Sequence, residues 1–200
     1  MRIISGALKG KAITFEKNIF TRPLKDSVRE NIFNILNHSN LIDVKLKNSK
    51  ILDLYSGVGS FGLESISRDA FSVTFVEQNK DMALIIKKNL VNLSIQNKAE
   101  IINDKIENYL NNSKIKKFDI IFFDPPFTDR FFIENLSIIK KKKYFNKKHL
   151  IIIHRESKSK DPLEGFMKIF LIKNYGRSKI IFGSFNWEAF FNWEAFLYRL

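Results

Sequence analysis

From Lys50 onward, short apolar segments alternate with segments of helical spacing, and this alternation limits the chain to few architectures. The apolar segments have the length and composition of buried strands, and the stretch from Lys80 to Leu93 repeats its apolar side chains at helical intervals. Repeated strand–helix units predict a parallel sheet with helices on both faces and ligands outside the carboxyl ends of its strands. The predicted strands are residues 51–55, 73–77, 100–102, 118–123 and 150–154, followed by a terminal hairpin of residues 168–172 and 179–182.

The length of 200 residues and the apolar fraction of 44% fit one α/β domain with small additions at its ends. We expect residues 1–45 to form a basic hairpin and helix extension, and residues 46–183 to form the α/β domain. Residues 184–200 make an aromatic tail, in which the six residues from Phe185 to Phe190 are repeated at once. The duplication predicts an apolar contact surface and points to no function.

With 34 basic against 21 acidic side chains, the formal net charge is +13, which favours a polyanionic partner such as nucleic acid. The alternative is a lysine-rich solvated surface in a chain of biased composition. The absence of cysteine excludes a disulfide scaffold, thiol catalysis and Cys-ligated metals. The three histidines lack metal-like spacing, so we expect no metal site, and His154 is expected to be a packed or surface residue rather than a catalyst. No apolar run reaches the roughly 18 residues that cross a bilayer, so we expect a cytoplasmic protein without a membrane partner.

A glycine loop follows the first predicted strand, with Gly57, Gly59 and Gly62 in the spacing G-x-G-x-x-G. Glycines let a turn tighten and let the backbone approach a ligand. The pattern by itself is weak, because it also suits a dinucleotide enzyme.

Two carboxylates narrow the ligand of this loop. Asp53 lies inside the first strand, where its charge would repel a pyrophosphate and attract an ammonium group. Glu77 ends the next strand, the usual place for a carboxylate that accepts ribose hydroxyls. A ligand with an ammonium group and a ribose but no phosphate is S-adenosylmethionine. The alternatives are a carboxylate satisfied by backbone N–H groups for Asp53 and a solvated strand end for Glu77.

The apolar strand of residues 118–123 ends on Asp124, Pro125, Pro126 and Phe127. The prolines fix the backbone and keep their carbonyl acceptors, Asp124 adds an acceptor, and Phe127 offers a flat apolar face. Acceptors beside a stacking face suit the exocyclic amino group of a planar base, whose lone pair they would hold toward an incoming methyl group. These four residues are therefore the expected catalytic motif, and a proline-rich turn that only ends a strand is the alternative.

Weaker signals surround this motif. Asp104 follows the third predicted strand and is either an acceptor for an adenine amino group or a helix cap. For Arg29 the alternative to a nucleic-acid contact is a surface charge or a helix-capping role. The candidate contacts to a nucleic-acid backbone are the basic side chains near the N-terminus, Arg2, Lys9, Lys11, Arg22 and Arg29.

Taken in order along the chain, these motifs match a known pattern. They are MRIISG at the start, RP and DSVRENIFN from residues 22 and 26, DLYSGVG from residue 53, Glu77, DPPF from residue 124 and YGRSK from residue 175. In this combination the chain closely resembles the RsmD family, the bacterial methyltransferases of small-subunit ribosomal RNA, over residues 1 to about 183. The tail after residue 183 has no counterpart in that pattern.

The resemblance implies a Rossmann-like class I methyltransferase fold, with a seven-stranded, mostly parallel sheet and residues 46–183 as the S-adenosylmethionine-dependent domain. It also implies methylation of one guanine at N2 in small-subunit ribosomal RNA, either naked or in the assembled subunit, by a protein that we expect to be a monomer. Asp53, Gly57, Gly59 and Glu77 would hold the cofactor, with Asp104 near the adenine. Asp124 and Phe127 would engage the guanine.

Other functions stay open at this point. Amino-methyltransferases that act on DNA adenine or on protein glutamine share the Pro-Pro-aromatic motif. A chain of 200 residues leaves little room for a DNA-recognition domain, and a glutamine substrate has less need of the charge. A non-catalytic RNA-binding protein with this fold is disfavoured by the intact carboxylates, and a nicotinamide dehydrogenase by Asp53 and the two prolines.

Overall fold

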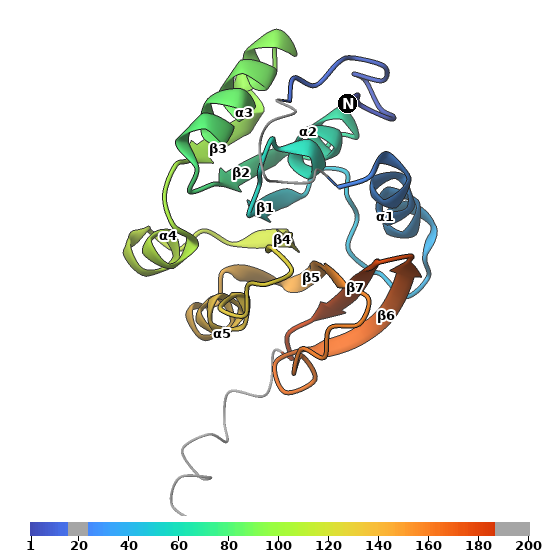
Figure 1. Ribbon diagram of the computed structural model, residues 1–200, viewed down its shortest axis with the longest axis vertical. Helices are drawn as coiled ribbons and strands as arrows, with labels where there is room; N and C mark the ends of the chain where they lie inside the picture. The colour runs from blue at the N-terminus through green and yellow to red at the C-terminus, as the bar shows by residue number, and fades with distance from the viewer. Residues whose placement is uncertain (16–23, 187–200) are drawn as a thin grey trace, which may run out of the picture.

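The computed structural model describes residues 1–15 and 24–186, and one sheet of seven strands runs through it (Figure 1). The strand order is β3-β2-β1-β4-β5-β7-β6, in which β7 is antiparallel to both of its neighbours and the pairs from β3 to β5 are parallel. The seven-stranded, mostly parallel sheet is therefore confirmed. The strands are β1 (Lys50–Leu54), β2 (Ser72–Val76), β3 (Ala99–Ile102), β4 (Phe118–Phe123), β5 (Phe145–Glu156), β6 (Lys168–Tyr175) and β7 (Ser178–Ser184).

Helices cover both faces of the sheet because successive side chains of a buried strand point to opposite sides. On one face, Ile51 and Phe122 belong to a core that includes side chains of α1, α2 and α3. On the other face, Leu52 and Phe123 pack with α4 and α5, which lie together on the left of Figure 1. The helices are α1 (Asp26–His38), α2 (Ser60–Ser67), α3 (Lys80–Asn92), α4 (Ile106–Asn112) and α5 (Phe132–Lys142), with a short 3-10 turn at Gln96–Lys98.

The strand order reverses at the centre of the sheet, where β1 lies between β2 and β4. After β1 the chain passes through α2 to β2 on one side, and after β4 it passes through α5 to β5 on the other. The loops that follow β1 and β4 therefore leave the same edge in opposite directions. This is the topological switch point at which doubly wound sheets bind ligands.

The N-terminal segment turns back on itself as a short antiparallel pair. A bridge joins Arg2 to Ala12, and the N–H groups of Ile3 and Ile13 donate to the carbonyls of Lys11 at 2.9 Å and Met1 at 3.0 Å. The pair is held against α2, since Glu64 accepts hydrogen bonds from the N–H groups of Ile4 at 2.7 Å and Ser5 at 2.9 Å. Residues 1–15 thus form a layer along α2, with Ile3 and Ile13 among the buried residues of the same core.

The end of the sheet also departs from expectation. β5 begins at Phe145, five residues before the predicted start, and its pairing with β4 shifts register between Phe118 and Ile120. The aromatic tail starts with Phe185, which is buried against Phe145 and His149, whereas most of the duplicated hexapeptides lie outside the described residues. Within residues 1–15 and 24–186, no helix is long and apolar enough to span a membrane.

Candidate active site

The glycine loop lies between β1 and α2 and depends on a left-handed backbone. Gly57 and Gly59 have φ values of 54° and 79°, and α2 begins directly afterwards at Ser60. Two carboxylates hold the loop in this shape. Glu77 accepts a hydrogen bond from the Gly57 N–H at 2.7 Å, and Asp53 accepts one from the Gly62 N–H at 3.0 Å. The loop and the first turn of α2 are therefore fixed to the ends of β1 and β2.

The carboxylate of Asp53 lies beneath the loop rather than in front of it. The residue is only 1% exposed, and burial raises the pKa of this carboxyl well above its usual value. We expected Asp53 to lie against the ligand itself, whereas in the structure its side chain faces the N–H of Gly62 in α2. Its carboxyl group therefore acts on a ligand chiefly by holding the loop.

Glu77 and Asp104 lie at neighbouring strand ends. Burial likewise raises the pKa of Glu77, whose second hydrogen bond comes from the Asn79 N–H at 2.8 Å. The side chain of Asn103 donates to the Glu77 carbonyl at 2.9 Å and so joins the ends of β2 and β3. Asp104 is exposed, and its Oδ1 accepts from the Lys105 N–H at 2.7 Å and from Nδ2 of Asn108 at 2.8 Å, whereas α4 has no side-chain cap.

The residues of the loop suit S-adenosylmethionine. A Cβ atom added at Gly57 would meet no protein heavy atom within 4 Å, so the backbone there borders open space that a ligand can enter. The acidic side chains at the ends of β1, β2 and β3 are Asp53, Glu77 and Asp104, and carboxylates favour ammonium and hydroxyl groups over phosphates. The site therefore fits a ligand with an ammonium group and a ribose.

The Asp-Pro-Pro-Phe motif emerges from β4 beside this loop. The Asp124 N–H donates to the carbonyl of Leu54, the last residue of β1, at 3.3 Å. The Asp124 carboxylate is partly exposed and lies 2.7 Å from Nδ1 of His154 on β5. Phe127 is 39% exposed, which leaves ring surface free for stacking. The structure thus brings the predicted catalytic motif and the predicted cofactor loop to one edge of the sheet.

Arg155, which the sequence argument did not single out, holds the backbone of the motif. This buried side chain donates from Nη1 to the Pro126 carbonyl at 3.0 Å and from Nη2 to the Phe127 carbonyl at 3.3 Å. Asp161 fixes the guanidinium from behind at 3.1 Å, and the guanidinium lies over the ring of Phe132. Of the two proline carbonyls, that of Pro126 is therefore occupied.

One feature of the sequence could have indicated that His154 and Arg155 belong to the site. They directly follow the apolar core of a strand that lies beside β4, and parallel neighbours end at the same edge. That signal requires the strand order, which a single sequence does not reveal.

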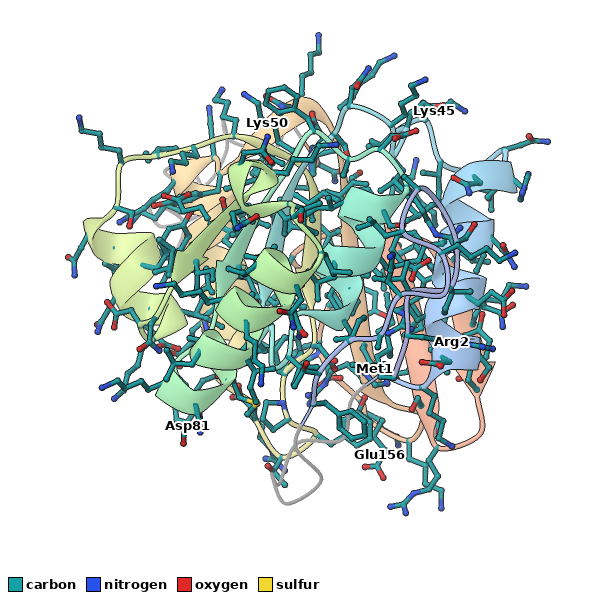
Figure 2. All side chains as sticks on the ribbon, turned by 90° about the horizontal axis from the view of Figure 1, so that it is seen from above. Met1, Arg2, Lys45, Lys50, Asp81 and Glu156 are labelled. Atoms are coloured by element: carbon teal, nitrogen blue, oxygen red, sulfur yellow. The ribbon has the colours of Figure 1, made fainter. Side chains whose placement is uncertain are left out.

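The residues predicted to contact nucleic acid have different environments in the structure. Arg2, Lys9 and Lys11 are exposed on the N-terminal segment, and Arg22 lies outside the described residues. Arg29 is a correction, because its side chain is fully buried and Nη2 donates to the Arg2 carbonyl at 2.6 Å. Since the N-terminal segment covers it, Arg29 ties that segment to α1 and does not reach a ligand. Figure 2 shows Arg2 near Met1 at the right of the molecule, between Lys45 above and Glu156 below, and Glu156 ends β5.

A sheet in which β1 and β4 meet at the centre while β7 runs antiparallel is the sheet of the class I methyltransferases, the class whose enzymes use S-adenosylmethionine. Solved structures agree with this class. The Escherichia coli protein yhhF is 25% identical, with a TM-score of 0.78 over 93% of this chain and 98% of that chain. An RNA methyltransferase from Salinibacter ruber, solved in complex with S-adenosyl-L-homocysteine, is 12% identical and shares the fold, with a TM-score of 0.61 over 84% of this chain and 95% of that one.

The sequence narrows this class to one family. Residues 1–184 match the family described as "Conserved hypothetical protein 95", and the chain belongs to this family. The chain is 36% identical to Ribosomal RNA small subunit methyltransferase D of Buchnera aphidicola (subsp. Acyrthosiphon pisum) over 156 residues, which are 78% of each protein. The protein of the same name in Escherichia coli is 29% identical over 78% of this chain and 75% of its own length. The resemblance to the RsmD family is thereby confirmed.

Proposed function

We propose that this chain transfers a methyl group from S-adenosylmethionine to the exocyclic N2 of a guanine in small-subunit ribosomal RNA. The observation that carries the proposal is the junction of Asp124 with Leu54, which puts an amine-binding motif beside the cofactor loop. Relatives named for the small ribosomal subunit support ribosomal RNA as the substrate class. The choice of N2 of guanine rests on the resemblance to the RsmD family, and the chemistry of Asp124 and Phe127 suits an exocyclic amino group of this kind.

The cofactor supplies an electrophilic methyl group on a sulfonium sulfur. Glu77 would accept the ribose hydroxyls with the lone pairs that its two backbone hydrogen bonds leave free. Gly57 would border the cofactor, and the buried carboxyl group of Asp53 would hold the loop that receives it. Asp104 would accept a hydrogen bond from the adenine amino group with its Oδ2, since Lys105 and Asn108 bind Oδ1.

The chain's own residues would orient the amine. The guanine stacks on Phe127, and the two N2 protons are donated to the carboxylate of Asp124 and to the carbonyl of Pro125. This geometry directs the nitrogen lone pair at the methyl carbon, so that the C–N bond forms as the C–S bond breaks. The nitrogen then carries an extra proton, which passes to the Asp124 carboxylate. Because the amine attacks directly, positioning supplies most of the rate enhancement.

The RNA would have to adapt to this site. A guanine within folded RNA reaches a strand-end pocket only when it is splayed out of its stack. Exposed basic residues of the N-terminal segment, Arg2 and Lys11 among them, would contact the phosphates of the flanking RNA. We propose that one copy of the chain acts on the RNA or on the assembled small subunit.

Methyl transfer from labelled S-adenosylmethionine tests the proposal. The substrates are small subunits that lack native methylation, the naked RNA extracted from them, and duplex DNA, with products identified by nucleoside mass spectrometry. We expect N2-methylguanosine in the subunit or its RNA. Label on DNA adenine or on protein glutamine would move the function to another amino-methyltransferase, and cofactor binding without any transfer would favour a binding protein.

Asp124→Ala and Asp124→Asn are the matched variants. Both should bind cofactor normally, and both should lower kcat on the order of 10²-fold, since neither side chain can hold the amine and take its proton. A wild-type rate in Asp124→Ala would remove Asp124 from the mechanism.

A further inference from the structure

A histidine of β5 contacts both ends of the catalytic motif. His154 Nδ1 lies 2.7 Å from Oδ1 of Asp124, and its imidazole meets the ring of Phe127 edge-on with the centroids 5.4 Å apart. The pairing of Phe123 with Ile153 brings the next residues of the two strands side by side. The contact therefore follows from the register of the sheet.

The surroundings of the imidazole define its hydrogen bonding. The His154 side chain is 11% exposed, and within the described part of the chain its Nε2 is buried and has no hydrogen-bond partner. An ionised Asp124 only accepts hydrogen bonds, so Nδ1 must carry the proton that joins the two groups. The imidazole then donates at one nitrogen and keeps the other lone pair out of water. An unpartnered nitrogen of this kind calls for an explanation beyond stability.

His154 and Arg155 approach the motif from opposite sides of the sheet, as successive residues of a strand do. Arg155 binds the carbonyls of Pro126 and Phe127, which fixes the backbone of the motif. Neither of these bonds restrains the side chain of Asp124. The only side chain that an ion pair or hydrogen bond joins to the Asp124 carboxylate in the described part of the chain is His154.

We infer that His154 is a positioning residue for methyl transfer, an inference that rests on the proposed function. Its Nδ1–H holds Oδ1 of Asp124 and leaves Oδ2 for the substrate amine, while its ring supports the edge of the Phe127 stacking face. The His154 side chain thus sets both the rotation of the Asp124 carboxylate and the position of the Phe127 ring. Both must be correct together, because the nitrogen lone pair is directed only when the base is stacked and its proton is bound.

Two substitutions separate positioning from simple packing. His154→Asn keeps a side-chain N–H donor at the place of Nδ1, and His154→Leu fills a similar space with no donor. We expect kcat on undermethylated small subunits to fall at least 10-fold in His154→Leu, and to fall only about 3-fold in His154→Asn, which keeps the donor to Asp124 but loses the ring that supports Phe127. KM for S-adenosylmethionine should not change in either variant, because the glycine loop is untouched.

The control is His38→Leu, which changes an exposed histidine at the end of α1. Thermal unfolding of all three variants shows whether each is folded at the assay temperature. A folded His154→Leu with the kcat of wild type overturns the inference. A loss of kcat in His154→Asn as deep as that in His154→Leu also overturns it, since a retained donor would then have no effect.

A measurement without turnover separates this inference from the proposed function. Nitrogen-15 NMR of the imidazoles, with His154 assigned from the spectrum of His154→Asn, reports which nitrogen carries the proton. We expect the Nδ1–H form in the wild type and a marked change of that signal in Asp124→Ala. The Nε2–H form in the wild type would overturn the inference even if the chain methylates RNA. The Nδ1–H form in a chain that methylates nothing would leave the pair intact and refute only the proposed function.

Discussion

At the scale of single residues, the site consists of side chains that hold the backbone and side chains left for ligands. Asp53 and Arg155 belong to the first kind, because they are buried and their polar atoms bind backbone groups of the glycine loop and of the catalytic motif. Asp124 and Phe127 belong to the second kind, since both retain exposed surface. Glu77 is buried and binds the Gly57 N–H, so any contact to a ligand would use the lone pairs that its backbone hydrogen bonds leave free.

Glu77 predicts opposite pH dependences for cofactor affinity and stability. Burial raises its pKa above the ordinary value of 4.5, so the folded chain protonates it at a higher pH than the unfolded chain does. As the pH falls through the folded pKa, we expect cofactor affinity to fall, because the ionised acceptor is lost. The contribution of Glu77 to the free energy of unfolding should rise over the same range, because the folded state binds the proton more tightly.

Calorimetric titration with S-adenosylmethionine and urea unfolding, both from about pH 8 down to about pH 4, below the ordinary pKa of a glutamate, measure the two quantities. Glu77→Gln should bind more weakly at pH 8 and show a flatter dependence in both measurements. An affinity of the wild type that stays constant over this whole range would contradict a role of ionised Glu77 in cofactor binding.

Two substitutions of Arg155 should affect kcat and the free energy of unfolding to different extents. Arg155→Lys keeps a positive charge near Asp161 but lacks the planar fork that reaches two carbonyls, so kcat should fall on the order of 10-fold with the fold retained. Arg155→Ala leaves Asp161 without its partner and should lower the free energy of unfolding by about 3–5 kcal/mol. Steady-state kinetics and urea unfolding test both outcomes, and an unchanged kcat in Arg155→Lys would show that the backbone of the motif needs no clamp.

At the scale of elements, replacing a glycine in the loop before α2 and replacing one within α2 should have different effects. A Cβ at Gly62 would lie 2.2 Å from Cε1 of Phe75, so Gly62→Ala must push α2 away from β2 and should cost about 1–3 kcal/mol of stability. A Cβ at Gly57 would meet nothing, although its φ of 54° makes alanine unfavourable by about 1 kcal/mol.

Gly57→Ala should therefore fold nearly as well as wild type but bind S-adenosylmethionine more weakly, since the new methyl group enters the space left for the cofactor. Urea unfolding and calorimetric titration of both variants distinguish the effects. Equal cofactor affinity in Gly57→Ala and wild type would show that the cofactor does not border this glycine.

The elements also show what local sequence can predict. The alternation of strands and helices and the glycine loop are encoded within a few residues, so the sheet and the position of this loop were predictable. The early start of β5 was not, because Lys147 and Lys148 are exposed on it and break the apolar pattern by which strands are found. The docking of the N-terminal segment on α2 was not predictable either, since Glu64, which accepts the Ile4 N–H, lies 60 residues further along the chain.

Long-range pairing limited the prediction of the site in the same way. Asp124 and Phe127 were found from their own motif, but their partners His154 and Arg155 lie about 30 residues further on and are brought there by strand order. Arg29 shows the converse case. Its charge indicated a surface contact, whereas an acidic residue on another helix and the N-terminal segment bury it.

At the scale of the whole molecule, the net positive charge of the chain does not extend to the candidate active site. The carboxyl edge of the sheet holds the acidic residues Asp53, Glu77 and Asp124, although the chain carries a net charge of +13. Figure 2 shows Lys45 and Lys50 on the opposite side of the molecule from Asp81 and Glu156. The phosphates of an RNA substrate would therefore be bound beside the site, by residues of the N-terminal segment, and not within it.

This arrangement predicts which lysines and arginines control RNA affinity. Each phosphate contact contributes roughly 0.7–0.9 to the slope of log K against log salt concentration, so Arg2→Gln combined with Lys11→Gln should reduce that slope by about 1.5. Lys147→Gln combined with Lys148→Gln removes the same charge from the exposed start of β5, at the opposite edge of the sheet, and should leave the slope unchanged. Binding of fluorescent small-subunit RNA at several salt concentrations measures both slopes. A larger reduction in the lysine pair of β5 would place the RNA on the amino edge of the sheet, too far from Asp124 for the base to reach it, and would require a second RNA-binding face.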